Sequence, residues 1–385
     1  MQYSNIRGNS KGGIMKKYIL LLLIFVLLFS ISCTKKADEV RLGVVLPLTG
    51  NISEFGEPML NGIKLAVDQY NNAGNTPKIH LFIYDGKGDI HVTNNRIKDL
   101  ISDKVIAIIG PITSATVMNS SVLTQKKGIV QIAPAATHVL ATKYSRSIWR
   151  ICYTDDDQGS IMAHFAKSLN LKNAFVIIDT TNVYSKGLAM YFKNAFEYLN
   201  GKTSKSYYVN GGNFNITDVA NSIKLSKADF VFIPMYYEMS YKIIRELRKN
   251  NITIPILGGD GWDSPALYKK DFSLPGKNYF CDHFFYETND DMAKDFLRNY
   301  EKRYKTIPSS MSALGYDAAS LLITEIKDNK AYDRSALLTA MVNLKSFYGV
   351  TGNMTFNKTP DPHKGFYIIE ISDKGAKLKS QLQSI

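Results

Sequence analysis

From Val40 onward, apolar residues follow two spacings that take turns along the chain. Short runs of consecutive apolar residues are typical of buried strands, and apolar residues at every third or fourth position are typical of amphipathic helices. Residues 57–71 show the helical spacing, with one broad apolar face made of Leu60, Ile63, Leu65, Ala66, Val67 and Tyr70. This alternation predicts an α/β fold in which helices cover parallel sheets, the doubly wound arrangement.

The alternation runs through twice and therefore predicts two lobes. Strands are expected first at 40–46, 79–84, 105–109 and 129–132, and then at 174–178, 203–209, 229–233 and 254–257. After a strand at 279–285, we expect helices at 290–304, 310–326 and 334–344 and short strands around 353–356 and 365–371. Because these helices outnumber the strands, we expect them to return to the first lobe. The chain would then cross between the lobes near 153–156, 285–288 and 348–352, which forms a hinge beside a cleft. The first lobe comprises 40–154 and 288–349, and the second comprises 155–287 and 350–385.

The stretch from Val105 to Thr137 brings two strand ends together. The expected strand at 105–109 is followed by Gly110-Pro111 and by a hydroxyl-rich helix start that contains Ser114. The expected strand at 129–132 is followed by a turn of small residues that ends at Thr137. Free backbone N–H groups and hydroxyls at neighbouring strand ends form a receptacle for an anion such as a carboxylate. No Arg or Lys lies in these two loops.

The second lobe supplies the opposite chemistry after its own strands. Asp260 lies in a Gly-Gly-Asp-Gly turn, where the backbone can approach a ligand, and its carboxylate suits an ammonium group. Aromatic residues at strand ends, namely Phe55, Tyr184, Tyr236, Tyr237 and Trp262, offer flat walls. A carboxylate site on one lobe and an ammonium site on the other predict an α-amino acid ligand.

Simpler explanations exist for each of these residues. Helix capping explains Ser114 or Thr137 taken alone, and a local turn explains Asp260. Aromatic residues after strands more often pack than bind. The run from Gly258 to Gly261 lacks the spacing of a dinucleotide-binding loop.

Composition and charge favour an ordinary folded protein over a disordered or nucleic-acid-binding one. The chain has 385 residues, 45% of them hydrophobic and 21% charged, as in an ordinary folded protein. Its formal net charge is +13, and four basic residues precede Cys33, so a chain starting there carries 13 − 4 = +9. Because the lysines are scattered, a solvated surface is favoured over nucleic-acid binding.

Metal, cofactor and catalytic chemistry are not expected. The six histidines are scattered and there is no Cys-x-x-Cys pair. The acids at 155–157 suit the amino end of a helix better than a calcium loop. His138 is the one histidine beside the cleft loops, and no nucleophile faces it, so we expect no enzyme activity. Cys152 and Cys281 are expected to be buried free thiols rather than a disulfide.

The amino-terminal residues predict export. Lys16 and Lys17 precede an apolar run at 19–29 that is too short to span a membrane, so residues 1–32 read as a signal peptide, with Met15 as a possible true start. The small residues before Cys33 resemble a bacterial lipoprotein processing site. This predicts a lipid on Cys33, a polar tether at 33–39 and a location outside the cytoplasm on a bacterial membrane. Ordinary cleavage that leaves Cys33 free is the alternative.

Several short sequence motifs within residues 40–377 resemble those of a known protein family. They are Leu46-Pro47-Leu48-Thr49-Gly50, Ile109-Gly110-Pro111 with Ser114, Ala133-Pro134-Ala135-Ala136-Thr137, Asp157-Gln158-Gly159, and Gly315-Tyr316-Asp317-Ala318. In this order the sequence resembles the leucine/isoleucine/valine-type substrate-binding proteins of ABC importers, which have the type I periplasmic-binding-protein fold. The resemblance implies a monomer that passes a small, branched-chain or similar amino acid to a permease.

The resemblance also implies roles for single residues. Ser114 and Thr137 match carboxylate binders, and the backbone of Ala135 matches an ammonium contact. Tyr184 and Tyr236 match aromatics that close over the ligand, while Phe55 and Met311 match pocket walls. Asp260 stands where leucine-binding members have Glu, one methylene longer. An amide, urea or aromatic acid as ligand, a sensory module of the same fold, and an α/β enzyme are the alternatives.

Overall fold

The computed structural model describes residues 38–269 and 271–382. Two sheets define two lobes, which we call lobe 1 and lobe 2. The predicted signal peptide, the possible start at Met15, Cys33 and nearly all of the predicted tether lie outside the described residues. Within the described ranges, no helix is both long and apolar enough to cross a membrane.

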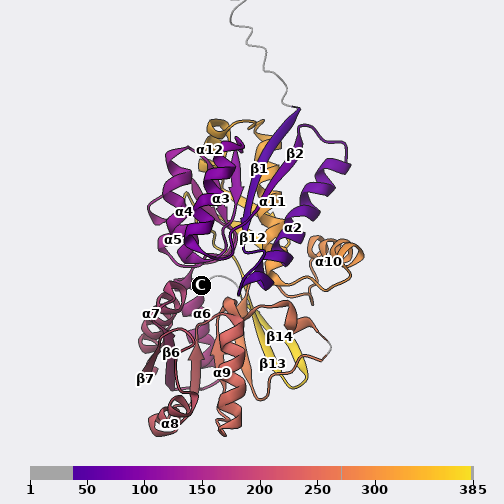
Figure 1. Cartoon of the computed structure of the whole chain (residues 1–385). Coiled ribbons are helices and arrows are strands. Elements are labelled where there is room, and N and C mark those ends of the chain that lie inside the picture. Colours follow the sequence, from indigo (N-terminus) through magenta and orange to yellow (C-terminus); the bar gives the residue numbers. More distant parts are fainter. Residues whose placement is uncertain (1–37, 270, 383–385) are drawn as a thin grey trace, which may run out of the picture. The chain divides into compact units, whose positions relative to one another are not determined.

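Lobe 1 contains a five-stranded parallel sheet in the order β2-β1-β3-β4-β5. Its strands are β1 (Glu39–Leu46), β2 (Lys78–Asp85), β3 (Ala107–Ile109), β4 (Val130–Ala133) and β5 (Ile148–Arg150). The connecting helices are α2 (Ser53–Asn72), α3 (Ile90–Ser102), α4 (Ser114–Lys126) and the short α5 (Leu140–Lys143). In Figure 1 these elements occupy the upper part of the ribbon drawing.

Lobe 2 contains a seven-stranded sheet in the order β14-β13-β10-β9-β8-β6-β7. Its parallel strands are β6 (Asn173–Asp179), β7 (Lys202–Val209), β8 (Phe230–Ile233), β9 (Ile256–Gly258) and β10 (Asn278–Asp282). The antiparallel hairpin β13 (Phe366–Ser372) and β14 (Gly375–Leu382) continues the sheet beside β10. Its helices are α6 (Asp155–Ser168), α7 (Val183–Tyr198), α8 (Ile216–Ser226), α9 (Tyr237–Lys249), and the 3₁₀ turns η1 (Asp260–Trp262) and η2 (Pro265–Tyr268).

The late helices pack on lobe 1. They are α10 (Asp291–Tyr304), α11 (Ser310–Asp328) and α12 (Arg334–Val342). α11 lies along α2, and glycines permit the contact, because a Cβ on Gly62 would be 2.0 Å from the Ser312 carbonyl oxygen. Figure 1 shows α10 and α11, in orange, beside the indigo α2, although they are far from it in sequence.

The chain passes between the two sheets three times. The passages lie after β5, after β10, and through the small hairpin of β11 (Ser346–Gly349) and β12 (Gly352–Thr355) with the segment 356–365. In this last segment the carbonyl of Pro360 accepts a hydrogen bond from Arg150 N–H at the end of β5. Short connecting segments of this kind are where hinge motions between lobes take place.

Several predicted boundaries were wrong. The acids Asp155, Asp156 and Asp157 form the first turn of α6 rather than preceding the helix, and Thr154 caps it. β10 ends at Asp282 instead of reaching 285, and α2 begins four residues earlier than expected. β11 and β14 were not predicted.

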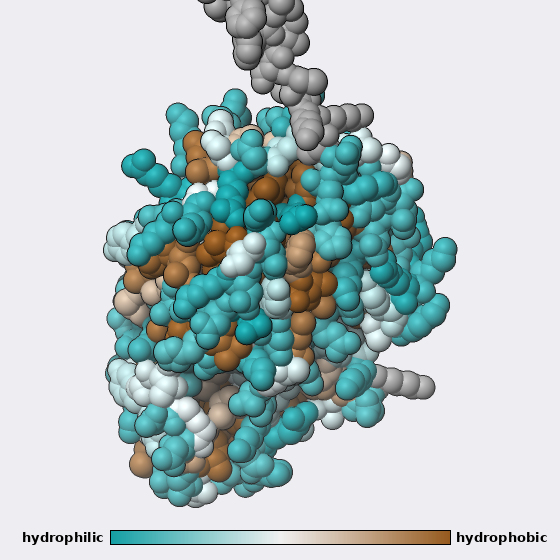
Figure 2. Space-filling view, turned by 45° about the horizontal axis from the view of Figure 1, so that its top comes forward, coloured by the Kyte–Doolittle hydropathy of each residue, from teal (hydrophilic) through white to brown (hydrophobic). Residues whose placement is uncertain are grey.

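Figure 2 shows a face covered mostly by polar side chains, with apolar ones in scattered patches. Cys152 and Cys281 are free and fully buried, as expected, and burial raises the pKa of the Cys152 thiol to about 12.

Candidate functional site

A small cavity lies between the two lobes at the carboxyl ends of their strands. Its volume is about 20 Å³, little more than one water requires. Six of the residues predicted to bind ligand line it, and so does Met311; the six are Phe55, Ser114, Ala135, Tyr184, Tyr236 and Asp260. The remaining lining residues are Ile112, Thr113 and Gly261.

Ser114 is not the cap of its helix. Thr113 caps α4, because its hydroxyl accepts a hydrogen bond from Thr116 N–H. Ser114, the first residue of α4, is only 2% exposed, and its Oγ accepts a bond of 3.2 Å from His138 N–H. Since that bond uses an oxygen lone pair, the hydroxyl proton remains available for an acceptor in the cavity. The amino end of α4 adds the favourable end of the helix dipole for an anion.

Thr137 lies just behind the cavity wall rather than among the residues that line it. It is fully buried, and its carbonyl accepts a hydrogen bond of 2.8 Å from Asp155 N–H. It does not cap α5, which begins three residues later. Its predicted role as a carboxylate binder therefore stays a prediction.

Asp260 is held by three neighbours. Tyr184 O–H donates to its Oδ1 at 2.9 Å, His283 Nε2 lies 3.2 Å from its Oδ2, and its backbone N–H donates to Gln158 at 2.7 Å. The side chain is thus fixed by contacts across lobe 2 and does not form a local Asx turn. Its residue is only 3% exposed, and it lines the cavity.

His283 supports Asp260 as a neutral imidazole. Burial lowers the pKa of His283 to about 4, although the hydrogen bond with Asp260 acts in the opposite direction. A neutral ring that contacts a carboxylate through Nε2 carries its proton there, so His283 donates to Asp260. The ring lies against Tyr153, with centroids 3.8 Å apart.

Aromatic rings form the cavity wall. Tyr184 and Tyr236 stack with centroids 5.3 Å apart and an interplanar angle of 10°. Phe55, from lobe 1, makes T-shaped contacts with both Tyr236 and Tyr237. The ring centroids are 5.7 Å and 5.1 Å apart, respectively. Trp262 is different, because its ring packs away in lobe 2 and its Nε1–H donates to Ile233 O. Phe55, Tyr184 and Tyr236 therefore belong to the cavity, and Trp262 supports it.

Three polar residues near the cavity were not predicted as site residues. Gln158 and His283 hold Asp260, and Asp155 lies behind the loop of Thr137. His283 directly follows β10, so the rule that ligands bind after strand ends would have found it had the strand been ended correctly. Burial raises the pKa of Asp155 well above its usual value, and the nearby Thr137 hydroxyl opposes this most strongly.

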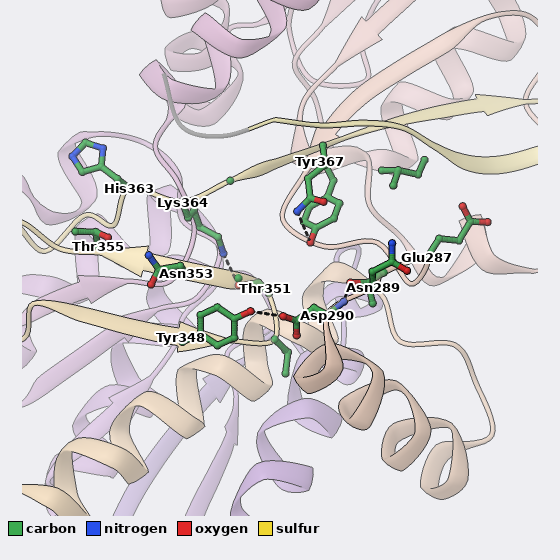
Figure 3. A pocket seen from close by; sticks show the side chains of 16 residues that line it. Glu287, Asn289, Asp290, Tyr348, Thr351, Asn353, Thr355, His363, Lys364 and Tyr367 are labelled. Atoms are coloured by element: carbon green, nitrogen blue, oxygen red, sulfur yellow. Dashed lines mark hydrogen bonds between the residues drawn. The ribbon is translucent and has the colours of Figure 1, made fainter.

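A larger, polar cavity of about 540 Å³ lies at the hinge and contains none of these site residues. Figure 3 shows Lys364 turned toward Thr351 on one side, and Tyr348 bonded to Asp290 on another. Burial lowers the pKa of Lys364 to about 8, and its ammonium also donates to Ile151 O. These bonds tie the hinge passages to one another.

Among the described residues, no group of three or more His, Cys, Asp or Glu could hold a metal ion.

Comparison with known families identifies the fold. A family model described as "Periplasmic binding protein" matches residues 39–376, which is most of the chain. The chain belongs to the periplasmic binding protein family. This confirms the resemblance noted in the sequence and the two-lobed α/β fold. Periplasmic binding proteins of this type are extracytoplasmic solute-binding components of ABC transporters.

Individual members of the family are similar over nearly the whole chain. The Leu/Ile/Val-binding protein BraC3 of Rhizobium johnstonii is 25% identical over 330 residues, which cover 84% of this chain and 89% of that protein. The leucine-binding protein LivK of Thermotoga maritima is 27% identical, with a TM-score of 0.82 and coverage of 89% and 99% of the two chains. The branched-chain amino-acid binding protein LivJ of Streptococcus pneumoniae, crystallised with isoleucine, is 25% identical with a TM-score of 0.82, covering 90% and 99%.

The same fold also occurs with other ligands. A solute-binding protein from Rhodopseudomonas palustris, in complex with 3,4-dihydroxybenzoic acid, is 21% identical with a TM-score of 0.79, covering 90% of this chain and 98% of that one. At this identity the similarity shows the fold alone.

Proposed function

We propose that this periplasmic binding protein captures a small amino acid, branched-chain or of similar size, in the cleft between its lobes and delivers it to an ABC permease. The observation that carries the proposal is the pairing of Ser114 and Asp260 on opposite walls of one cavity. A hydroxyl at a helix amino end suits a carboxylate, and a fixed carboxylate suits an ammonium. The α-carbon of an amino acid carries both groups.

Each lobe contributes a distinct part of the proposed binding. Ser114 and the amino end of α4 bind the ligand carboxylate, with Thr137 assisting from behind. Asp260 and the backbone of Ala135 bind the ammonium. The rings of Phe55, Tyr184 and Tyr236, with Met311, enclose an apolar side chain, because they supply apolar surface without adding charge.

Ligand entry requires motion of the lobes. A cavity of about 20 Å³ is too small for an amino acid, so the lobes must separate and close again around it. Ligand contacts made only in the closed form then favour closure.

Thermal-shift screening of residues 33–385 against amino acids, amides, urea and aromatic acids tests this function. A micromolar amino-acid ligand at millimolar concentration stabilises the folded protein by about 4 kcal/mol and raises the melting temperature. Leucinamide and isoamylamine keep the amine but lack the carboxylate, so a smaller shift with both than with leucine shows recognition of the carboxylate. If no amino acid raises the midpoint, the proposed function fails. A shift with an aromatic acid instead, as in the complex of the R. palustris protein, would replace it.

We also propose that a lipid on Cys33 anchors the protein, which works as a monomer at a bacterial membrane. Support comes from the basic, apolar and small-residue order before Cys33 and from membership in an extracytoplasmic family. The division into two lobes at the three hinge passages completes the proposed architecture.

A further inference from the structure

Arg150 is a fully buried cation that lies close to the site without lining the cavity. It ends β5, and its side chain is 0% exposed. A guanidinium has five N–H donors and loses its hydration on burial, so each donor requires an acceptor. The identity of those acceptors indicates what the residue does.

The acceptors lie mainly in the loop that follows β4. Arg150 Nη1–H donates to Ala136 O at 2.9 Å, and Nη2–H donates to His138 O at 3.2 Å and to Thr142 Oγ1 at 2.7 Å. Nε–H donates to Asp361, a residue of the third hinge passage, at 2.5 Å. One side chain therefore holds two carbonyls of the loop and connects them to the hinge.

These bonds fix the orientation of the peptide groups in the loop. Asp155 N–H holds the carbonyl of Thr137, so the carbonyls of residues 136, 137 and 138 all have protein donors. Across a trans peptide the next N–H points opposite to the carbonyl, and the 136–137 bond is trans. Thr137 N–H therefore points away from Arg150.

The same loop orients Ser114. His138 N–H donates to Ser114 Oγ, and its own carbonyl is one of the two that Arg150 holds. A shift of His138 would release the Ser114 hydroxyl from its orientation toward the cavity.

We infer that Arg150 is a positioning residue for carboxylate recognition: it fixes the loop 136–138 so that Thr137 N–H and the Ser114 hydroxyl are ready for the ligand carboxylate. This inference rests on the proposed function for the identity of the ligand. The orientation of the loop itself does not depend on it.

Arg150→Lys tests the role, because Lys keeps the charge but cannot reproduce the planar fork. We expect leucine affinity to fall by about tenfold or more, as for one or two lost charge-assisted hydrogen bonds. Affinity for isoamylamine, which has no carboxylate, should change much less. A purely structural role would weaken both ligands by the same factor.

Hydrogen exchange provides a readout that needs no ligand. Amides in a peptide spanning 135–141 should exchange faster in Arg150→Lys than in the wild type. Arg248→Lys is the matched control, since Arg248 also donates to several carbonyls, those of Ile252, Ile254 and Pro275. It lies at the far end of α9, ~16 Å along the helix from Tyr237. This control should leave the loop and the ratio of affinities unchanged.

Thr142→Val serves if Arg150→Lys does not fold, because it removes one acceptor of Arg150 and keeps the side-chain shape. It should change both readouts in the same direction by a smaller factor. Unchanged loop exchange, or equal loss of both ligands, overturns the inference. If the wild type binds no amino acid but the loop amides still exchange faster in the variants, the proposed function fails. The role of Arg150 in fixing the loop 136–138 is then still supported.

Discussion

Asp260, the proposed ammonium acceptor, is held in one orientation by its neighbours. Tyr184 and His283 each donate to one of its oxygens, so its orientation is set before a ligand arrives. Preorganised groups lose less entropy when they bind. The resemblance implies a glutamate at this position, one methylene longer, and the fixed geometry supports the proposal that the shorter aspartate is a directional acceptor.

Asp260→Ala should weaken a zwitterionic ligand by about 2–5 kcal/mol, because a desolvated ammonium would lose its counter-charge. Isothermal titration calorimetry with the best ligand from the thermal screen measures this. Asp260→Asn keeps the shape and isolates the effect of charge. Melting curves of both variants without ligand verify that they fold. Undiminished affinity would mean that the ligand has no amino group or that another residue receives it.

Asp263 is a second buried acid, and it makes stability depend on pH. Burial raises its pKa to about 6, against bonds from Tyr268 O–H and Met311 N–H. Because the folded state holds the proton more tightly than the unfolded state, this contribution to stability is complete below about pH 3.9 and is lost as pH rises through 6.

Asp263→Asn should remove that contribution. Urea unfolding at pH 4.5 and pH 7.5 measures it. When the pH rises from 4.5 to 7.5, the change in unfolding free energy should be more favourable for the variant than for the wild type. His283 has a pKa lowered to about 4 and acts in the opposite direction, but it is present in both proteins and cancels. An identical pH dependence in the two proteins would show that Asp263 does not titrate in this range.

At the scale of elements, hydrophobic periodicity predicted the well-buried strands and the amphipathic helices. It did not predict the edge strand β14 or the end of β10. β14 was missed because its polar residues alternate with half-buried ones, and its lysines face solvent at the edge of the sheet. β10 was extended too far because Phe284 and Phe285 continue the apolar run, although they pack in loops rather than in the sheet. Apolar runs report burial, whereas strand ends depend on hydrogen-bonded partners that are distant in sequence.

Contacts between residues distant in sequence also limited the prediction of the residues around the cavity. The sequence placed residues directly after predicted strands, such as Asp260, near the cleft, and Asp260 lines the cavity. Gln158 and His283 were not, because their contact with Asp260 joins residues 102 and 23 positions away from it. Ser114 was distinguished from a helix cap only by the hydroxyl of Thr113 taking that role.

The contact between α2 and α11 provides a test of element packing. Gly62→Ala would place a methyl group 2.0 Å from Ser312 O, so the helices must move apart. We expect a loss of about 1–3 kcal/mol in unfolding free energy, measured by urea titration. Gly212→Ala is the control, because its Cβ would meet only the flexible end of Met239 at 3.5 Å. Equal stability of the two variants would show that the helices adjust without cost.

At the scale of the whole molecule, the proposed lipid anchor on Cys33 would determine where the protein works. Palmitate labelling in a bacterial host should depend on Cys33, and Cys33→Ser should abolish the label and release the protein from membranes. Cys152→Ser should keep it, because that thiol is buried within the fold. Labelling that survives Cys33→Ser would contradict the lipid anchor.

Closure of the lobes depends on contacts that only the closed form can make. Glu54 in α2 accepts a hydrogen bond of 2.8 Å from Ser264 O–H in lobe 2, next to the contact of Phe55 with Tyr236 and Tyr237. Glu54→Ala removes the bond without touching the cavity, so the closed form becomes less stable relative to the open one. With a contribution of about 1 kcal/mol, ligand should dissociate about five times faster while its association rate stays the same. Stopped-flow tyrosine fluorescence measures both rates. Glu57→Ala, one turn along α2 and exposed, is the control. Slower association with unchanged dissociation would mean that Glu54 acts on the encounter with ligand and not on closure.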